Sequence, residues 1–276
     1  MMNERSLYVL LCICLIVGAF ASPEDTKSRV KDEKPTPASD GRIKHVVVLM
    51  MENRPFDHML GWSSEELGTE GLTGEEFNLV DPSDPNSEKV YVSDKAPFLN
   101  ECDPSHTVPS TTAKLFSSQS AKDSGVPDMA GFVAAQNGST EGSGGQALDW
   151  CNVMDGFPPS RVPVLTALAK NYAVMDHFYA SVPGPTWPNR MFALSGTSAG
   201  DEDTNMWYHD IVGKLYPQRT IFDQVDQAGQ QWKLYYNDTP WELILEKVAH
   251  SPDNLHPLSV FFEDCEEGTW LCWGYI

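Results

Sequence analysis

The chain has 276 residues, in which 39 Asp and Glu residues outnumber 19 Lys and Arg residues and give a net charge of −20 at pH 7. This charge argues against nucleic acid as a partner, because phosphate backbones are bound by basic surfaces, and it disfavours electrostatic docking on anionic lipid. If the substrate carries phosphate, a cation must offset its charge inside the site, so the composition predicts a bound metal ion.

The first 21 residues have the features of a secretory signal peptide. Leu7–Phe20 is almost wholly apolar and closes on Ala19-Phe20-Ala21, the small-x-small pattern that signal peptidase prefers. About fourteen apolar residues are short for a membrane span, which needs roughly twenty; an uncleaved anchor is the alternative. We therefore expect residues 1–21 to be removed, residues 22–42 to form a flexible, charged and Pro-rich arm, and the product to be secreted.

The mature chain keeps four cysteines, and an oxidising compartment favours disulfides among them. Four cysteines allow three pairings, and the sequence does not choose among them. These residues are Cys102, Cys151, Cys265 and Cys272. Asn137-Gly138-Ser139 and Asn237-Asp238-Thr239 match the pattern for N-glycosylation, which also fits a secreted protein.

The folded part is predicted to begin at Ile43 with a buried strand. His45–Met51 is a continuous apolar run, rich in β-branched residues and too short for an ordinary helix, as in a parallel sheet buried on both faces. Glu52-Asn53 follows directly, where open α/β sheets bind their ligands. A carboxylate and a carboxamide there form half of a site for a hard cation; an exposed acid beside a turn-forming Asn is an equally good interpretation. Asp57 and His58 suit either catalysis or bracing of the local turn, and we favour bracing.

The middle of the chain shows little periodicity. Gly61–Val80 is acidic and Gly-rich, Lys89–Ser93 fits a short strand, and Gln136–Gln146 is typical of a flexible surface loop rather than a phosphate-binding fingerprint. Regular structure is predicted again from Ser160, the cap of a helix with Pro163 in its first turn. The apolar side of that helix comprises Val164, Leu165, Leu168, Ala169 and Tyr172.

The later elements alternate between strands and helices. Strands are expected at Tyr172–Met175 and Trp232–Tyr236, and helices at Pro188–Ser195, from Thr220 to near Gly229, and at Trp241–Ala249. Such alternation predicts α/β layers with a mostly parallel sheet. We expect one domain over residues 43–276.

A proline-rich segment, Ser181–Arg190, places Thr186 at or near the N-cap of the helix that begins at Pro188. The unpaired N–H groups and the positive end of the helix dipole would bind an anion there and stabilise a Thr alkoxide. An ordinary capped turn is the alternative, which the local chemistry alone favours. His106 lies in a loop, where a lone histidine is usually a surface residue, and His177 suits a supporting or packing role better than that of a ligand.

Two long motifs, in order, resemble those of the phosphoesterase family, which includes bacterial and plant phospholipases C and related acid phosphatases. His45–Leu60 (HVVVLMMENRPFDHML) resembles the opening motif and Ala180–Gly200 (ASVPGPTWPNRMFALSGTSAG) the second signature. Asp103–Thr107 resembles a DPGHS-like segment between them, and Asp128–Val133 also fits. The resemblance runs from about Ile43 to about Thr269.

The resemblance implies an alkaline-phosphatase-like α/β fold, a three-layer sandwich around a mostly parallel sheet. It matches Glu52 and Asn53 to metal ligands, and Thr186 to a nucleophilic hydroxyl that also touches the metal. Asn189 and Arg190 match the segment that shapes the phosphate site. His106 matches a histidine near the transferred phosphoryl group.

The implied activity is hydrolysis of phosphoric esters with a divalent ion of the Ca²⁺ or Mg²⁺ type. A phospholipid substrate, cleaved to diacylglycerol and a phosphorylated headgroup with transient contact to a membrane surface, is the leading interpretation. An acid phosphatase acting on soluble monoesters is the closest alternative. A secreted binding protein without turnover is the other.

The chain departs from the family pattern near its C-terminal end. Family members carry a later Asp-Glu-His-Gly-Gly-Phe-like motif that supplies further metal ligands, and nothing like it occurs in this sequence. Phe261–Thr269 still resembles the family, whereas Trp270–Ile276 does not. We therefore expect a C-terminally truncated catalytic domain, with too few protein ligands for a strong metal site and an exposed sheet edge.

Overall fold

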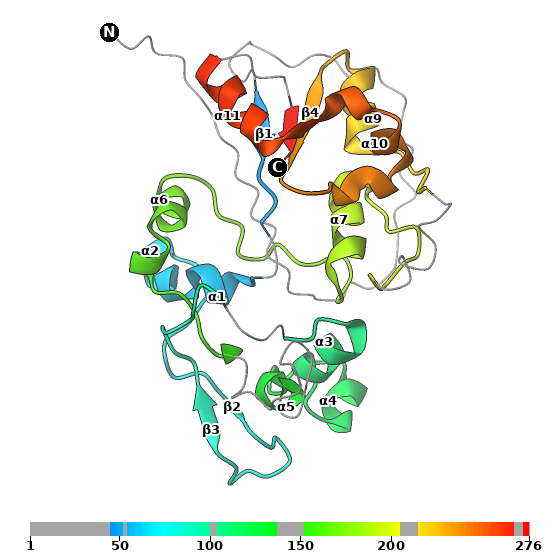
Figure 1. Cartoon of the computed structure of the whole chain (residues 1–276). Coiled ribbons are helices and arrows are strands. Elements are labelled where there is room, and N and C mark those ends of the chain that lie inside the picture. The colour runs from blue at the N-terminus through cyan, green and yellow to red at the C-terminus, as the bar shows by residue number, and fades with distance from the viewer. Residues whose placement is uncertain are drawn as a thin grey trace. The chain divides into compact units, whose positions relative to one another are not determined.

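The computed structural model describes residues 45–51, 54–99, 104–136, 152–204, 215–267 and 273–275 (Figure 1). These residues fall into two compact units, one comprising residues 45–51 and 187–275 and the other residues 54–186. The expected signal peptide and arm lie outside the described residues, and the single domain expected over residues 43–276 stays a prediction. Within the described ranges, no helix has the length and apolarity needed to cross a membrane.

The first unit contains a parallel four-stranded sheet with the order β1-β6-β4-β5. Its strands are β1 (Val46–Val48), β6 (Trp273–Tyr275), β4 (Trp232–Tyr236) and β5 (Leu255–Pro257). The register aligns Val47 with Gly274, and Leu234 with both Tyr275 and Leu255. The prediction of a mostly parallel sheet is confirmed for this unit, and the predicted strand over residues 45–51 is present but shorter.

Helices cover both faces of β4. Its residues Trp232 and Leu234 are buried against one set of helices, whereas Lys233 and Tyr235, which point to the other face, contact Asp264 of α11. The unit's helices are α7 (Thr186–Ser195), α9 (Ile221–Gln227), η4 (Trp241–Ile244), α10 (Glu246–Ala249), η5 (Pro252–Asn254) and α11 (Leu258–Glu267) (Figure 1). The core on the first face is formed by Met191, Leu194, Phe222, Trp232, Leu234, Ile244, Leu245 and Val248. The resulting order of helices, sheet and helix agrees with the predicted α/β class.

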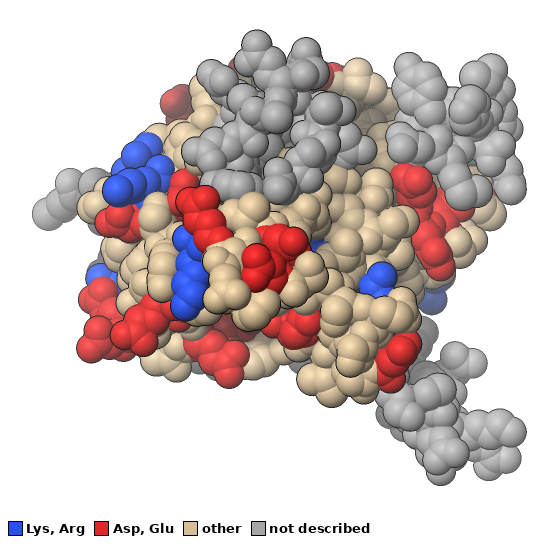
Figure 2. Space-filling view, turned by 90° about the horizontal axis from the view of Figure 1, so that it is seen from below, with Lys and Arg blue, Asp and Glu red and all other residues tan. Residues whose placement is uncertain are grey.

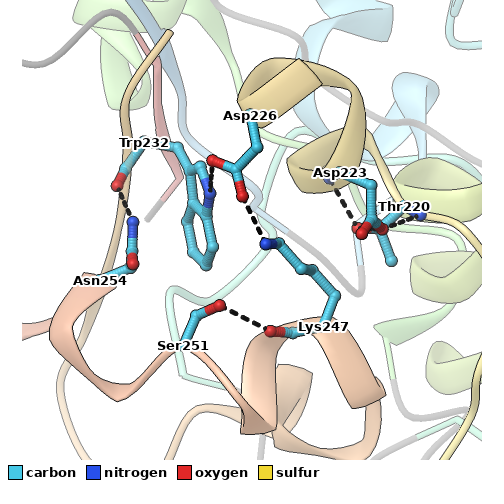
Figure 3. Close-up of polar contacts among 7 residues, drawn as sticks. All are labelled: Thr220, Asp223, Asp226, Trp232, Lys247, Ser251 and Asn254. Carbon is cyan, nitrogen blue, oxygen red and sulfur yellow. Dashed lines mark hydrogen bonds and ion pairs between the residues drawn. The ribbon is translucent and has the colours of Figure 1, made fainter. Parts of the chain in front are cut away.

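A polar network joins α9, β4, α10 and η5 beside this core (Figure 3). Thr220 and Asp223 form a capping box that starts α9, as the sequence predicts. Asp226, near the end of α9, accepts a hydrogen bond from Trp232 Nε1 (3.1 Å) and forms an ion pair with Lys247. Asn254 Nδ2 donates to the backbone carbonyl of Trp232 at 2.7 Å. Side chains of α9 and η5 therefore hydrogen-bond to β4, and α10 supports the α9 side chain through Lys247.

The predicted helix Trp241–Ala249 is interrupted at Leu245. Leu245 has an extended backbone (φ −80°, ψ 127°), which separates η4 from α10. The reason is a parallel bridge to Tyr216, whose N–H donates to Ile244 O at 2.8 Å and whose carbonyl accepts from Glu246 N at 2.9 Å. Backbone groups used in this bridge cannot also continue a helix.

The second unit, residues 54–186, consists of short helices and one hairpin. Its elements are α1 (Phe56–Leu60), η1 (Gly61–Ser63), α2 (Ser64–Leu67), β2 (Phe77–Leu79), β3 (Lys89–Tyr91), α3 (Val108–Leu115), α4 (Gln119–Ser124), α5 (Phe132–Gln136), η3 (Pro159–Arg161) and α6 (Pro163–Asn171) (Figure 1). β2 and β3 pair antiparallel, so the strand expected near residue 89 is confirmed. Buried Asn78 ties β2 to α5, because its Oδ1 accepts from Phe132 N at 2.8 Å.

Three predictions for the segment around α6 are wrong. Ser160 lies in η3, and the residue that precedes α6 is Val162, which makes no side-chain cap bond. The apolar side of α6 is not buried, since Val164 is 71% and Tyr172 66% exposed. No strand forms at Tyr172–Met175, and this stretch pairs with no other strand among the described residues. An apolar pattern shows which side of an element can be buried, but not that another element covers it.

The predicted modification sites fall mainly outside the described residues. Of the four cysteines, only Cys265 is described, and it carries a free, exposed thiol on α11, so a disulfide at Cys265 is not confirmed. Asn237 is exposed directly after β4, whereas Asn137 and the loop expected up to Gln146 lie beyond the described ranges. On the face shown in Figure 2, Asp and Glu side chains are spread widely with few Lys and Arg among them.

Candidate functional site

The start of α7 carries the predicted nucleophile. Pro185 is buried directly before the helix, Thr186 is its first residue, and Pro188 occupies the first turn, where its missing N–H costs nothing. The helix thus begins two residues earlier than predicted. The half-buried Thr186 hydroxyl lies in the turn whose N–H groups have no partner within the helix. Partial positive charge at this helix end favours an anion or an alkoxide.

Asn189 and Arg190 share a face of α7 with Thr186, because residues three and four positions apart are neighbours on a helix. Asn189 is 9% exposed. Arg190 Nη1 lies 4.0 Å from Oε1 of buried Glu242, and its guanidinium carbon lies 5.1 Å from the ring centre of Trp241. The structure therefore brings three predicted site residues together on one helix turn. Glu242 and Trp241, which contact Arg190, were not predicted, because only the fold reveals which acid and ring reach it.

His106 lies in the loop before α3, in the unit formed by residues 54–186. Its Nδ1 is 3.1 Å from the carbonyl oxygen of Pro104, and since a carbonyl can only accept, Nδ1 carries the proton. Proton transfer by His106 would therefore involve the other ring nitrogen, Nε2. The loop is held by α3, because Ser110 Oγ donates to Ser105 O at 3.0 Å and Lys114 contacts the same carbonyl. The contact with Pro104 therefore holds the His106 ring in one orientation.

The predicted metal ligands Glu52 and Asn53 lie outside the described residues. Within the described ranges, no group of three or more His, Cys, Asp or Glu side chains is arranged to hold a metal ion. Of the predicted ligand set, the described part of the chain supplies only the Thr186 hydroxyl. A lone hydroxyl does not make a site for a hard cation, which takes six to eight oxygen ligands in the case of Ca²⁺.

The contacts of His58 support its interpretation as a brace, and the same interpretation of Asp57 stays a prediction. The ring of His58 accepts a hydrogen bond from Arg54 Nη1 and packs edge-on against Phe157, with ring centres 4.8 Å apart. The backbone carbonyl of His58 accepts from Phe157 N at 2.7 Å. Burial and then the charge of Arg54 lower the pKa of His58, and burial followed by the charges of nearby glutamates raises the pKa of Asp57.

The packing role considered for His177 is wrong. Its side chain is 56% exposed, and its Nδ1 lies 2.9 Å from Asp176 Oδ1, with Glu70 Oε2 3.8 Å from Nε2. The hydrogen bond to Asp176 raises the pKa of His177. His177 is therefore part of a surface ion pair.

Comparison with known proteins places these residues in a family context. Residues 43–268 match the Phosphoesterase family. Non-specific phospholipase C1 of Arabidopsis thaliana is 41% identical over 238 residues, which cover 86% of this chain and 42% of that protein. Non-specific phospholipase C4 of the same plant is 35% identical over 238 residues, covering 82% and 42%. Hemolytic phospholipase C of Pseudomonas aeruginosa is 28% identical over 205 residues, covering 70% and 25%.

The matches cover most of this chain but less than half of each relative. The chain spans 42% of the length of each of the first two relatives, so their activities are properties of longer proteins. Strand β6 follows the last matched residue, 268, yet it lies inside the sheet between β1 and β4. The match nevertheless includes both long motifs and Thr186, Asn189 and Arg190. On the family match and on 41% identity over 86% of its length, the chain belongs to the Phosphoesterase family.

Proposed function

We propose that this chain is a secreted, metal-dependent hydrolase of phosphoric esters with phospholipase C-like specificity. It would cleave phospholipid to diacylglycerol and a phosphorylated headgroup, with Thr186 as nucleophile. The observation that carries the proposal is the position of Thr186 at the start of α7, with Asn189 and Arg190 on the same helix face, in a member of the Phosphoesterase family. The names of the relatives favour phospholipids over soluble monoesters. We also propose the alkaline-phosphatase-like sandwich as the complete fold, which the parallel order β1-β6-β4-β5 supports.

Two displacements at phosphorus account for the reaction. Thr186 first loses its hydroxyl proton to water and attacks phosphorus through Oγ1, the bond to the diacylglycerol oxygen breaks, and the leaving oxygen takes a proton from Nε2 of His106, which solvent later replaces. Water then attacks the phosphothreonine, releases the phosphorylated headgroup and regenerates the hydroxyl. The N-terminus of α7 and the Arg190 guanidinium stabilise the negative charge of the phosphoryl oxygens in both steps.

We include a divalent ion of the Ca²⁺ or Mg²⁺ type in the proposal, with Glu52, Asn53 and Thr186 as its protein ligands. Such an ion supplies positive charge that offsets the phosphoryl oxygens and favours the ionised hydroxyl. This part rests on the family resemblance and on the net charge of −20, because the described residues supply too few ligands to test it.

Hydrolysis by Thr186 variants tests the proposal. With phosphatidylcholine as substrate, Thr186→Ala should lower the rate of diacylglycerol release on the order of 10⁴-fold, because the variant lacks the attacking oxygen. Thr186→Ser should retain partial activity, and Thr197→Ala, which removes a hydroxyl after α7, should be unaffected. Chelation should abolish the activity, and Ca²⁺ or Mg²⁺ should restore it. Equal rates for wild type and Thr186→Ala would contradict the nucleophile assignment, and no turnover with any divalent ion would favour a binding protein without activity.

A further inference from the structure

Two arginines and two phenylalanines form a cluster in the unit of residues 54–186. Phe98 and Phe157 stack with ring centres 5.1 Å apart and planes 28° from parallel. The guanidinium carbon of Arg161 lies 4.2 Å from the centre of Phe98, and that of Arg54 lies 5.6 Å from the centre of Phe157. Cation–π contacts at these distances are attractive. We call Arg54, Phe98, Phe157 and Arg161 the Arg–Phe cluster.

The two arginines of the Arg–Phe cluster differ in their contacts. Arg54 is used internally, because Nη2 donates to the backbone carbonyl of Phe98 at 3.1 Å and Nη1 donates to His58. It therefore anchors the loop that carries Phe98. Arg161 is exposed and lies against the ring of Phe98. A guanidinium that lies against a ring through its face keeps the N–H groups on its edge for two oxygen atoms of an anion such as phosphate.

The anchored loop presents apolar side chains to solvent. Leu99 is 90% exposed and Phe98 is 56% exposed, although Phe157 beneath them is buried. A single exposed leucine is unremarkable on a protein surface. Here it stands next to a half-exposed phenylalanine ring and an exposed guanidinium. This combination suits the interface of a lipid bilayer, where Arg side chains lie at headgroup level and apolar side chains such as Leu and Phe reach the acyl boundary.

The cluster is close in sequence to two of the three segments of the proposed site. Arg54 directly follows Glu52-Asn53, and Leu99 lies seven residues before His106. A lipid surface bound by the cluster would therefore be held by the same stretches of chain that carry the candidate site residues.

We propose that the Arg–Phe cluster and Leu99 dock the protein on a phosphatidylcholine-type bilayer surface. Leu99 and Phe98 enter the acyl boundary, and Arg161 binds a lipid phosphate through the edge of its guanidinium. The net charge of −20 repels an anionic bilayer, so the zwitterionic surface, which offers phosphates without net charge, is the matching partner. The inference rests on the proposed function, since it names the surface on which that function meets its substrate.

Sedimentation of the full chain with phosphatidylcholine vesicles tests the docking surface. Leu99→Asp should lower the partition coefficient about tenfold or more, because a leucine that enters the acyl boundary is replaced by a charge. Arg161→Gln should lower it about threefold, as expected for an exposed ion pair. The matched control is Val126→Asp, at a residue 66% exposed on the loop after α4, and it should bind as wild type does. Glycerophosphocholine, which has the headgroup without acyl chains, should not displace the protein.

The outcomes separate this inference from the proposed function. Far-UV circular dichroism and thermal midpoints check that each variant is folded. Equal partition of wild type and Leu99→Asp, or equal losses in Leu99→Asp and Val126→Asp, would overturn the docking surface. Hydrolysis of a monomeric short-chain phosphatidylcholine provides the second readout, which Leu99→Asp should leave unchanged. If the wild type hydrolyses the lipid but Leu99→Asp partitions as wild type does, the proposed function stands and the docking surface is wrong. If partition depends on Leu99 but no hydrolysis is seen, the docking surface stands and the proposed function is wrong.

Discussion

The carboxylate of Asp264 is a buried charge in the sheet unit and therefore needs partners. It is 7% exposed, and its Oδ2 accepts hydrogen bonds from Lys233 Nζ at 2.6 Å and from the hydroxyl of Tyr235 at 2.7 Å. Burial and then the bond to Asp264 raise the pKa of Tyr235, which stays protonated and donates. The group holds α11 on one face of β4. An intact buried ion pair contributes little net stability, but removing one partner is costly because the other charge stays buried without compensation.

Asp264→Asn should lower the free energy of unfolding by about 3 kcal/mol, because it leaves the Lys233 ammonium buried without a counter-charge. Urea denaturation followed by circular dichroism measures the change. Glu263→Gln, an exposed neighbour on α11, serves as control and should change stability by less than about 0.5 kcal/mol. A loss no larger than that of the control would show that Lys233 finds another partner or reaches water.

His58 predicts a pH dependence of stability. Burial and the charge of Arg54 lower its pKa in the folded state below the ordinary value of 6.5, and Asp155 opposes this only in part. Below pH 6.5 the unfolded chain therefore binds a proton that the folded chain resists. The stabilisation is fully present above that pH and is lost as pH falls through the folded-state pKa.

His58→Gln should reduce this acid-side loss, while an amide oxygen at position 58 still accepts from Arg54. Free energies of unfolding measured between neutral pH and the acid transition give the difference between variant and wild type. That difference cancels the effect of Asp57, whose raised pKa acts in the opposite direction. His250→Gln, at a side chain 68% exposed, is the control. Parallel curves for all three proteins would rule out His58 as the titrating group.

At the scale of single elements, α9 depends on its capping box. The Thr220 N–H and hydroxyl both donate to Asp223 Oδ2 at 2.7 Å, and the Asp223 N–H donates to Thr220 Oγ1 at 3.3 Å (Figure 3). Thr220 is completely buried, so water cannot replace the lost bonds. Thr220→Ala should destabilise the protein by about 1–2 kcal/mol, measured by urea denaturation. Thr220→Ser keeps the cap oxygen and should recover most of the loss; equal losses in both variants would assign the effect to the methyl group instead.

Elements with local signals were predicted well. The Thr220 cap, the left-handed Gly229 (φ +68°) and the apolar pattern of β4 define α9 and β4 within a residue or two. The same holds for α7, whose prolines fix its start. These signals depend on residues adjacent in sequence, and therefore the sequence alone contains them.

Elements that depend on distant partners were not predictable. Leu245 leaves its helix to bridge Tyr216, and Tyr172–Met175 has strand-forming residues but pairs with no described strand. The same limit applies to the candidate site. Local prolines locate Thr186, whereas the contact of Arg190 with Glu242 joins residues far apart in sequence. Which acid meets which base is decided by packing rather than by local pattern.

The charge of the whole molecule acts against its compact state. The chain has a net charge of −20 at pH 7, and Asp and Glu outnumber Lys and Arg on the face shown in Figure 2, so folding brings like charges together. Screening weakens this repulsion over a Debye length of about 8 Å at physiological ionic strength. Salt also weakens ion pairs such as Lys170–Glu66, but exposed pairs contribute little. The repulsion should therefore dominate the response to salt.

The thermal midpoint at pH 7 should rise with NaCl, most steeply between about 10 and 150 mM, where the Debye length shortens most. Differential scanning calorimetry at constant pH measures it. Near the isoelectric point of about 4.5 the net charge vanishes and the rise should disappear, which provides the control. A midpoint that falls with salt at pH 7 would mean that specific ion pairs, with buried Lys233–Asp264 first among them, outweigh the repulsion. A rise of equal size at both pH values would instead indicate a general salting-out effect on apolar burial, since that effect does not depend on net charge.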